Sequence, residues 1–317
     1  MMEAIDTIGK RDIGARNPST LGGGRLAREA GALRVLSPAE WAFWRDNGYV
    51  VLRGAVAPEQ VERIERLIWE FEEMDPADPA TWYTPEKSAL RRNELSYNAG
   101  MVELYNHQYL WDTRQDPRIH GAFADLWGTN ALWVSIDRVN CNLPPEPGFE
   151  FKSFMHWDYD PDGDVDSVQG VLAVTDQLDE DVGGFVCIPQ LYRDYPAWRA
   201  AQGADFDWYR PDVASLPKTA VTMAKGDLLI FNSRLCHGIR QNVSKGKVRM
   251  AQYIAMLPAR EEDVEGRDWR IRCWRERIPP QGYSLHGDPR RLEQTRYETA
   301  RLTPLGERLL GLRSWQE

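Results

Sequence analysis

The feature that most constrains the fold of this chain is a succession of short β-like runs in its second half. Turn residues separate these runs, which lie at 131–141, 168–175, 184–188, 219–223, 228–231 and 248–256. Many short strands with turn punctuation are typical of a sandwich, a jelly roll or a barrel. The sequence therefore predicts a mainly β core over about residues 131–258.

Helical segments are predicted on both sides of this core. Ser37 and Glu40 form a capping box with Pro38 at the first helical position, so a helix is expected to begin there. A strand at 49–52 and a second, amphipathic helix from Ala57 are expected to follow it. Further helices are expected before the core and in the Arg-rich tail.

The predicted elements form one domain. Residues 1–36 are rich in Gly and Arg without a sustained period, so we expect a flexible N-terminal arm. The remaining residues, 37–317, are expected to form a single domain with a helical and aromatic lead-in at 37–130. The jelly-roll core would follow, and then a helical C-terminal extension at 259–317.

Composition excludes several classes of protein. The chain has 317 residues and a net charge of −9 without a basic tract, which argues against nucleic acid as a partner. It has no apolar run of about 18 residues, so we expect no membrane-spanning helix. Its N-terminus lacks the apolar segment of a secretory signal, and we therefore expect a cytoplasmic protein. Four widely spaced cysteines without a CxxC pair are expected to be reduced and mostly buried.

The residues that carry chemistry lie in the predicted core. His156 and Asp158 are two apart, so on a strand both side chains point to the same face. His237 follows 81 residues after His156, in a chain with five histidines. Two histidines and one carboxylate form the facial triad of non-haem Fe(II) oxygenases, which leaves three coordination positions of the iron open. We therefore predict that His156, Asp158 and His237 are the metal ligands and the catalytic centre.

Arg249 is the predicted co-substrate residue. It lies 12 residues after His237, on a β-like run where Arg249, Ala251 and Tyr253 share one face. The small alanine leaves room for the guanidinium, which pairs bidentately with a carboxylate better than a lysine does. Arg249 is thus expected to hold the distal carboxylate of a 2-oxo acid. An ordinary ion pair on a strand is the alternative.

Together these residues resemble the phytanoyl-CoA dioxygenase family of Fe(II)/2-oxoglutarate oxygenases, over most of residues 38–312. The resemblance is carried by residues 47–54, the triad segment His156-Trp157-Asp158, the Asp176 to Pro189 loop with Gly183-Gly184, residues 226–238, Asn242, Arg249 and the tail 302–312. It implies a double-stranded β-helix (jelly roll, cupin-like) core with flanking helices. It also implies Fe(II) as cofactor, 2-oxoglutarate and O₂ as co-substrates, and the same roles for the triad and Arg249.

This chain departs from the family outside the metal ligands. Family members often read Pro-Gly-Ser-His where this chain has 189–192, and some carry a hydroxyl residue where Ile239 stands. Asn140 and Asn142 are therefore further candidates for binding 2-oxoglutarate. Related halogenases replace the carboxylate of the triad with a small residue, so the retained Asp158 favours hydroxylation.

Substrate residues are expected near the triad and in the aromatic segment before the core, because such segments cover the active site in this family. The candidates are Tyr105, His107, Trp111, Lys152, Met155 and Trp157. Burial in the core is the alternative for the aromatic residues. For Lys152, the alternative is an ordinary position on the surface.

The sequence thus predicts a dioxygenase that hydroxylates an unactivated C–H bond of a small metabolite, with release of succinate and CO₂. A metal-binding jelly roll without turnover, a cupin-like zinc hydrolase and a calcium-binding module are the alternatives. The last rests on Asp158 to Gly163, which matches half of an EF-hand loop, although Gln169 stands where that loop requires a bidentate Glu. No motif selects a substrate or an oligomeric state.

Overall fold

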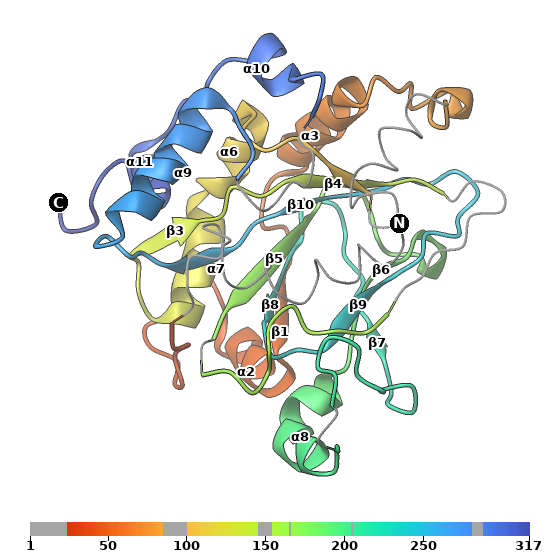
Figure 1. Ribbon diagram of the computed structural model, residues 1–317, viewed down its shortest axis with the longest axis vertical. Helices are drawn as coiled ribbons and strands as arrows, with labels where there is room; N and C mark the ends of the chain where they lie inside the picture. The colour runs from red at the N-terminus through yellow and green to blue at the C-terminus, as the bar shows by residue number, and fades with distance from the viewer. Residues whose placement is uncertain (1–23, 85–99, 145–153, 165, 204–205, 281–287) are drawn as a thin grey trace.

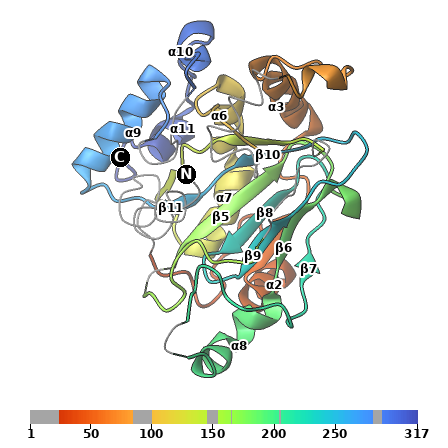
Figure 2. The same ribbon diagram turned by 45° about the vertical axis from the view of Figure 1, so that its right-hand side comes forward.

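The computed structural model describes residues 24–84, 100–144, 154–164, 166–203, 206–280 and 288–317. Its strands form three antiparallel sheets. The largest has six strands in the order β1-β8-β5-β10-β4-β2, and the others are β7-β6-β9 and β11-β3 (Figures 1 and 2). The strands are β1 (Tyr49–Leu52), β2 (Met101–Val102), β3 (Leu132–Val134), β4 (Val139–Asn142), β5 (Val168–Ala173), β6 (Gly184–Cys187), β7 (Thr219–Ala220), β8 (Leu228–Asn232), β9 (His237–Arg240), β10 (Arg249–Tyr253) and β11 (Met256–Pro258).

The inner faces of the six-stranded and three-stranded sheets pack against each other. Val171, Leu229 and Ala251 from the large sheet share one buried cluster with Phe185 and Cys187 of β6. Two antiparallel sheets with a common apolar interior form the jelly-roll core that the sequence predicts, and the sheets do not close into a barrel.

Helices cover the outer face of the large sheet (Figure 1). Leu172 and Ile230, which point outward from β5 and β8, pack with Phe123 in one apolar cluster. Ile64 and Phe71 share a second cluster with residues of β4 and β10. The helices are α2 (Pro38–Asn47), α3 (Pro58–Phe71), α6 (Gln108–Arg114), α7 (Pro117–Trp127), α8 (Pro189–Ala200), α9 (Val264–Glu276), α10 (Leu292–Arg296) and α11 (Pro304–Leu310), with short 3₁₀ turns at Pro79–Thr81 and Glu180–Val182.

The helix starts predicted from capping residues are confirmed. The side chain of Ser37 accepts a hydrogen bond from the Glu40 N–H at 3.2 Å, and Glu40 accepts one from the Ser37 N–H at 2.7 Å. Gly48 adopts the left-handed conformation that ends α2, with φ 75°. Thr303 caps α11 by accepting a hydrogen bond from the Gly306 N–H.

The elements that were not predicted include α8, β9 and the two-residue strand β2. Helix α8 contains Pro196 and has only two buried residues, Pro189 and Leu191, so its apolar pattern is weak. Strand β9 has only four residues and includes a glycine and an arginine. Its identity as a strand depends on pairing with β6, from Gly184 opposite Arg240 to Cys187 opposite His237.

Part of the segment before α2 lies against the domain. The carboxylate of Asp125 in α7 accepts hydrogen bonds from the backbone N–H groups of Arg34, Val35 and Leu36, each at 2.9 Å. Gly24 forms an isolated antiparallel bridge with Asp166. The flexible arm predicted over residues 1–36 otherwise falls on residues 1–23, outside the described part of the chain.

None of the helices in the described ranges has both the length and the apolar character needed to cross a membrane.

Candidate metal centre and co-substrate site

The structure brings His156, Asp158 and His237 together. One possible ligand atom from each lies within 4.8 Å of the others. Oδ1 of Asp158 is 3.4 Å from Nε2 of His156, and its Oδ2 is 3.3 Å from Nε2 of His237. Among the described residues, these three make up the only such group of potential metal ligands. The arrangement fits a facial triad for Fe(II).

Backbone pairing holds the two histidines side by side. The His156 N–H donates to the carbonyl of His237 at 2.8 Å, and the His237 N–H donates back at 3.0 Å. Nδ1 of His237 lies 3.0 Å from the carbonyl of Leu235, and Nδ1 of His156 lies 3.3 Å from that of Phe154. A proton on each Nδ1 would satisfy these carbonyls and leave each Nε2 as the metal ligand.

Three residues that the sequence analysis did not assign to the metal site surround the triad. Gln169 donates a hydrogen bond to Oδ2 of Asp158 at 2.5 Å. The ring of Phe185 stacks on His237 at 5.4 Å, and that of Phe231 lies 4.6 Å from it. Gln169 could have been found from strand alternation, since it shares a face of β5 with Val171.

The electrostatics of the triad favour an ionised Asp158. Burial opposes its ionisation, but the two histidines outweigh burial and hold the pKa of Asp158 well below its ordinary value. Burial likewise opposes protonation of His156, yet the hydrogen bond and charge of Asp158 raise the pKa of that histidine. The site therefore presents an anionic ligand between two imidazoles, as a divalent cation requires.

Arg249 points into the same interior. It opposes Asn142 on β4, and Ala251 opposes Asn140 on β4 and Ala173 on β5. The arginine is 2% exposed, and its Nε and Nη2 have no hydrogen-bond partner in the described part of the chain. Burial lowers the pKa of this guanidinium. A buried cation without a partner is costly, so the site fits a carboxylate ligand.

Tyr253 shares the inward face of β10 with Arg249 and Ala251. Burial raises the pKa of Tyr253, while the charge of Arg249 lowers it. Asn140 and Asn142 lie on this face too, opposite Ala251 and Arg249. Strand β6 borders both parts of the site, because Cys187 pairs with His237 and a Cβ atom at Gly184 would lie 3.9 Å from Cδ of Arg249.

The proposed substrate residues divide into separate groups. Trp157 points away from the triad, donates from Nε1 to the carbonyl of Arg234 at 2.9 Å and packs with residues of α8. Trp111 is fully buried in the core behind the large sheet. His107 caps α6 by accepting from the Tyr109 N–H at 3.1 Å. Met155 packs on the α8 side.

Lys152 lies outside the described residues. Tyr105 lies near the C-terminal extension, where its hydroxyl donates to Oε2 of Glu103 at 3.0 Å. Glu103 in turn lines a cavity of about 170 Å³ together with residues of the extension. Tyr105 itself is fully buried and belongs to the same apolar cluster as Trp111.

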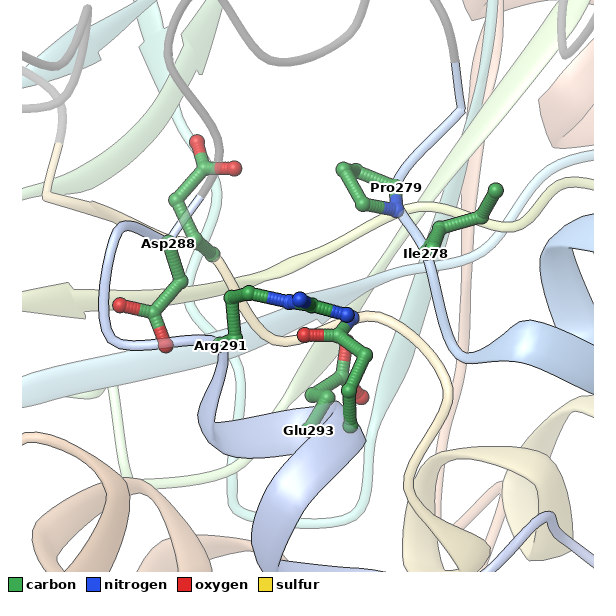
Figure 3. A pocket seen from close by; sticks show the side chains of 7 residues that line it. Ile278, Pro279, Asp288, Arg291 and Glu293 are labelled. Atoms are coloured by element: carbon green, nitrogen blue, oxygen red, sulfur yellow. The ribbon is translucent and has the colours of Figure 1, made fainter.

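Figure 3 shows Asp288, Arg291 and Glu293 around this cavity. Glu293 accepts hydrogen bonds from the N–H groups of Tyr105 and Asn106, and burial raises the pKa of Glu293 to about 7. Asp288 accepts from Arg290 and from the Leu292 N–H. Glu293 therefore holds the extension against the lead-in, whereas Asp288 bonds within the extension.

The acidic turn after Asp158 shows no calcium-binding arrangement in its described residues. Asp162 accepts hydrogen bonds from Tyr195 and Arg199, and Asp166 pairs with Arg234. Its carboxylates thus point to separate cations and do not converge on a common centre.

Comparison with known proteins agrees with this geometry. The model of the phytanoyl-CoA dioxygenase family matches residues 44–251, and enzymes of this family use Fe(II), 2-oxoglutarate and O₂. The chain is 25% identical over 265 residues to the Ava biosynthesis cluster protein O of Aspergillus versicolor, covering 74% of this chain and 84% of that protein. It is 21% identical over 248 residues to the human peroxisomal phytanoyl-CoA dioxygenase, covering 73% and 72% of the two chains.

A solved structure shares the fold. That of GlcNAc Inducible Gene 2 from Candida albicans matches with a TM-score of 0.63 at 11% identity, covering 99% of this chain and 85% of that one. The family match spans the triad, Arg249 and most of the jelly roll. The chain therefore belongs to the phytanoyl-CoA dioxygenase family and is an Fe(II)/2-oxoglutarate dioxygenase.

Proposed function

We propose that this protein hydroxylates an unactivated C–H bond of a small metabolite and converts 2-oxoglutarate to succinate and CO₂. The observation that carries the proposal is the pairing of two complementary features in one interior. The triad presents a single carboxylate and two imidazoles, and Arg249 presents a buried guanidinium with two unpaired donors. A metal ion would complete the triad, and the distal carboxylate of a dianionic 2-oxo acid would pair with Arg249.

Each residue has a defined role in this reaction. His156, Asp158 and His237 would hold Fe(II) from one side and leave the other side open. Arg249 would bind the distal carboxylate of 2-oxoglutarate and so orient its oxo acid end towards the metal. With both bound, the iron would supply the oxidative decarboxylation and the hydrogen abstraction.

The surroundings of the triad favour hydroxylation. Asp158 occupies a ligand position that a chloride would need in a halogenase. Phe185 and Phe231 cover the ring of His237 with apolar surface and restrict the access of water to it. Gln169 holds one oxygen of Asp158, which favours ligation through the other.

A small metabolite is the proposed class of substrate. A coenzyme A ester carries several phosphates, and a chain with net charge −9 and no basic tract offers them little attraction. The relative from Aspergillus versicolor is described as a biosynthesis cluster protein, which supports a role in the metabolism of such compounds.

Succinate formation tests the proposal. Purified protein, Fe(II), 2-oxoglutarate and O₂ would be incubated with pools of metabolites, and succinate and hydroxylated products would be measured by mass spectrometry. At least one pool is expected to stimulate succinate release and to gain one oxygen atom from O₂. The Asp158→Ala variant should form neither product.

The alternative of a metal-binding jelly roll without turnover makes the opposite prediction. It allows iron to bind, with no succinate above the level of Asp158→Ala in any pool. A product that gains chlorine in place of oxygen would contradict the hydroxylase proposal while leaving the dioxygenase site in place.

A further inference from the structure

A buried glutamine beside Arg249 has no role in the site as described so far. Gln177 is 1% exposed, and neither Nε2 nor Oε1 of its side chain has a hydrogen-bond partner among the described residues. Buried side-chain amides nearly always have partners, because an unsatisfied polar group inside a protein is destabilising. An amide with both ends unpaired therefore points to a ligand.

The backbone directs this side chain into the jelly-roll interior. Gln177 and Met223 form an isolated antiparallel bridge, with N–H to carbonyl distances of 2.8 and 3.2 Å. Residues directly opposite each other in such a pair point to the same side. Met223 is fully buried in the cluster that fills the space between the two sheets, so Gln177 carries an amide into that interior.

Gly184 places Gln177 next to Arg249. A Cβ atom at Gly184 would lie 3.0 Å from Oε1 of Gln177 and 3.9 Å from Cδ of Arg249. Both side chains thus lie against the same glycine, which adopts φ 108° at the start of β6. A side chain at position 184 would enter the space that the two share.

The two side chains are close to each other, yet neither satisfies the other. Nε and Nη2 of Arg249 and both polar atoms of Gln177 have no partner in the described ranges. Three of these four groups are donors. A carboxylate is the complementary group, because it offers about four acceptor positions on two oxygens.

We propose that Gln177 is a second binding residue for the distal carboxylate of 2-oxoglutarate. Its Nε2 donates one hydrogen bond to that carboxylate, and Arg249 donates from its guanidinium. The neutral amide adds a donor without adding a second positive charge, so the dianion is bound without excess cationic charge. This inference rests on the proposed function, since it assigns a further residue to the same co-substrate.

The test combines melting temperature with steady-state kinetics for Gln177→Leu and Gln177→Glu. Without ligands, Gln177→Leu should melt at the same temperature as the wild type or higher, because the substitution removes an unsatisfied buried amide. With Fe(II) and 2-oxoglutarate under anaerobic conditions, its ligand-induced rise in melting temperature should shrink. Its KM for 2-oxoglutarate should rise about 10- to 100-fold, as expected for one lost hydrogen bond to a charged group, with a much smaller change in kcat.

Gln177→Glu sharpens the test. Its carboxylate would pair with Arg249 and occupy the place of the co-substrate, so its KM should exceed that of Gln177→Leu. If Gln177 had only a structural role, the KM for 2-oxoglutarate would not rise from the wild type to Gln177→Leu and again to Gln177→Glu.

Gln252→Leu is the matched control. Gln252 is equally buried and lies on β10, but its amide is satisfied by the carbonyl of Leu110 and by Thr113 behind the sheet. This variant should melt at a lower temperature and keep the wild-type KM. If Gln177→Leu keeps the wild-type KM and ligand response, the inference is wrong and the proposed function stands. If the wild-type protein itself shows no response to 2-oxoglutarate, both fail.

Discussion

His156 and His237 pair through their backbones although 81 residues separate them in the chain, with N–H to carbonyl distances of 2.8 and 3.0 Å. This bridge places two imidazoles against the single carboxylate of Asp158 before any metal binds. Because the backbone carries the arrangement, substitution of one ligand side chain should remove metal binding without disrupting the fold.

Arg249→Leu should weaken the binding of 2-oxoglutarate without destabilising the apoprotein. A hydrogen bond to a charged group contributes about 1.5–3 kcal/mol, so the KM for 2-oxoglutarate should rise by at least about tenfold. The melting temperature should not fall, because the buried guanidinium has unpaired donors that the substitution removes. Kinetics and thermal unfolding of the same preparation check both parts.

Arg270→Leu serves as the control for this prediction. Arg270 is also buried, but its guanidinium donates to the carbonyls of Leu309 and Leu310. Its loss should lower the melting temperature and leave the KM unchanged. An unchanged KM in Arg249→Leu would reassign the co-substrate anchor.

Gln169→Leu should lower the affinity for iron. Gln169 donates to one oxygen of Asp158 and so orients the carboxylate towards the two histidines. Removing such a partner of a metal ligand typically costs about 10- to 100-fold in metal affinity. Titration of the metal-free protein with Fe(II) measures the change. Wild-type affinity in this variant would show that the hydrogen bond does not orient Asp158.

Asp125→Ala should loosen the segment before α2. The carboxylate accepts three backbone hydrogen bonds from residues 34–36, and buried donors left without a partner cost about 1–3 kcal/mol each at most. Urea unfolding should show lower stability, and limited proteolysis should cut within 24–36 sooner than in the wild type.

Arg34→Ala removes only the ion pair with Asp125, at 3.6 Å, in which the arginine side chain is 45% exposed, and should change stability by less than about 1 kcal/mol. Equal effects of the two substitutions would mean that the ion pair and not the backbone hydrogen bonds anchors this segment.

His107 should make the protein less stable in acid. Burial lowers the pKa of His107 from 6.5 to about 4, and its Nδ1 accepts the hydrogen bond that caps α6. Between these two values the unfolded chain binds more protons, so stability rises with pH from about 4 to 6.5, by up to about 2–3 kcal/mol. Above pH 6.5 this contribution is constant.

His107→Asn keeps a capping oxygen and removes the titration. The free energy of unfolding would be measured against pH for the wild type and for His107→Asn. The difference between the two proteins should vary between about pH 4 and 6.5 and be constant above pH 6.5. A difference that does not vary with pH in this window would contradict the lowered pKa.

The sequence predicted the parts of the site that depend on local alternation along a strand. His156 and Asp158 are two residues apart, and Arg249 is two and four residues from Ala251 and Tyr253, so each set shares a face in any strand. The mainly β class and the helix caps were equally local, because turn residues and capping residues act over three or four positions. The choice of a jelly roll over a sandwich or a barrel came from the family resemblance.

The features that sequence reasoning missed depend on pairing between distant segments. Strand β9 forms because Cys187 and Phe185 of β6 lie opposite His237 and Ile239. Gln177 lies in a polar loop and is buried only because it pairs with Met223. Trp157 was expected near the substrate, but the same alternation that joins His156 and Asp158 directs it to the opposite side.

The visible charge-transfer band of 2-oxoglutarate chelated to Fe(II) reports directly on whether the triad and Arg249 form one site. The metal-free protein would be mixed anaerobically with Fe(II) and 2-oxoglutarate. Its visible spectrum would be compared with the spectra of Asp158→Ala and Asp162→Ala. Asp162 is a nearby carboxylate that binds Tyr195 and Arg199 and lies outside the triad. A band is expected in the wild type and in Asp162→Ala, and it should be lost in Asp158→Ala. With iron demonstrably bound, the absence of the band from the wild type, or its persistence in Asp158→Ala, would contradict the assignment of the triad and its co-substrate.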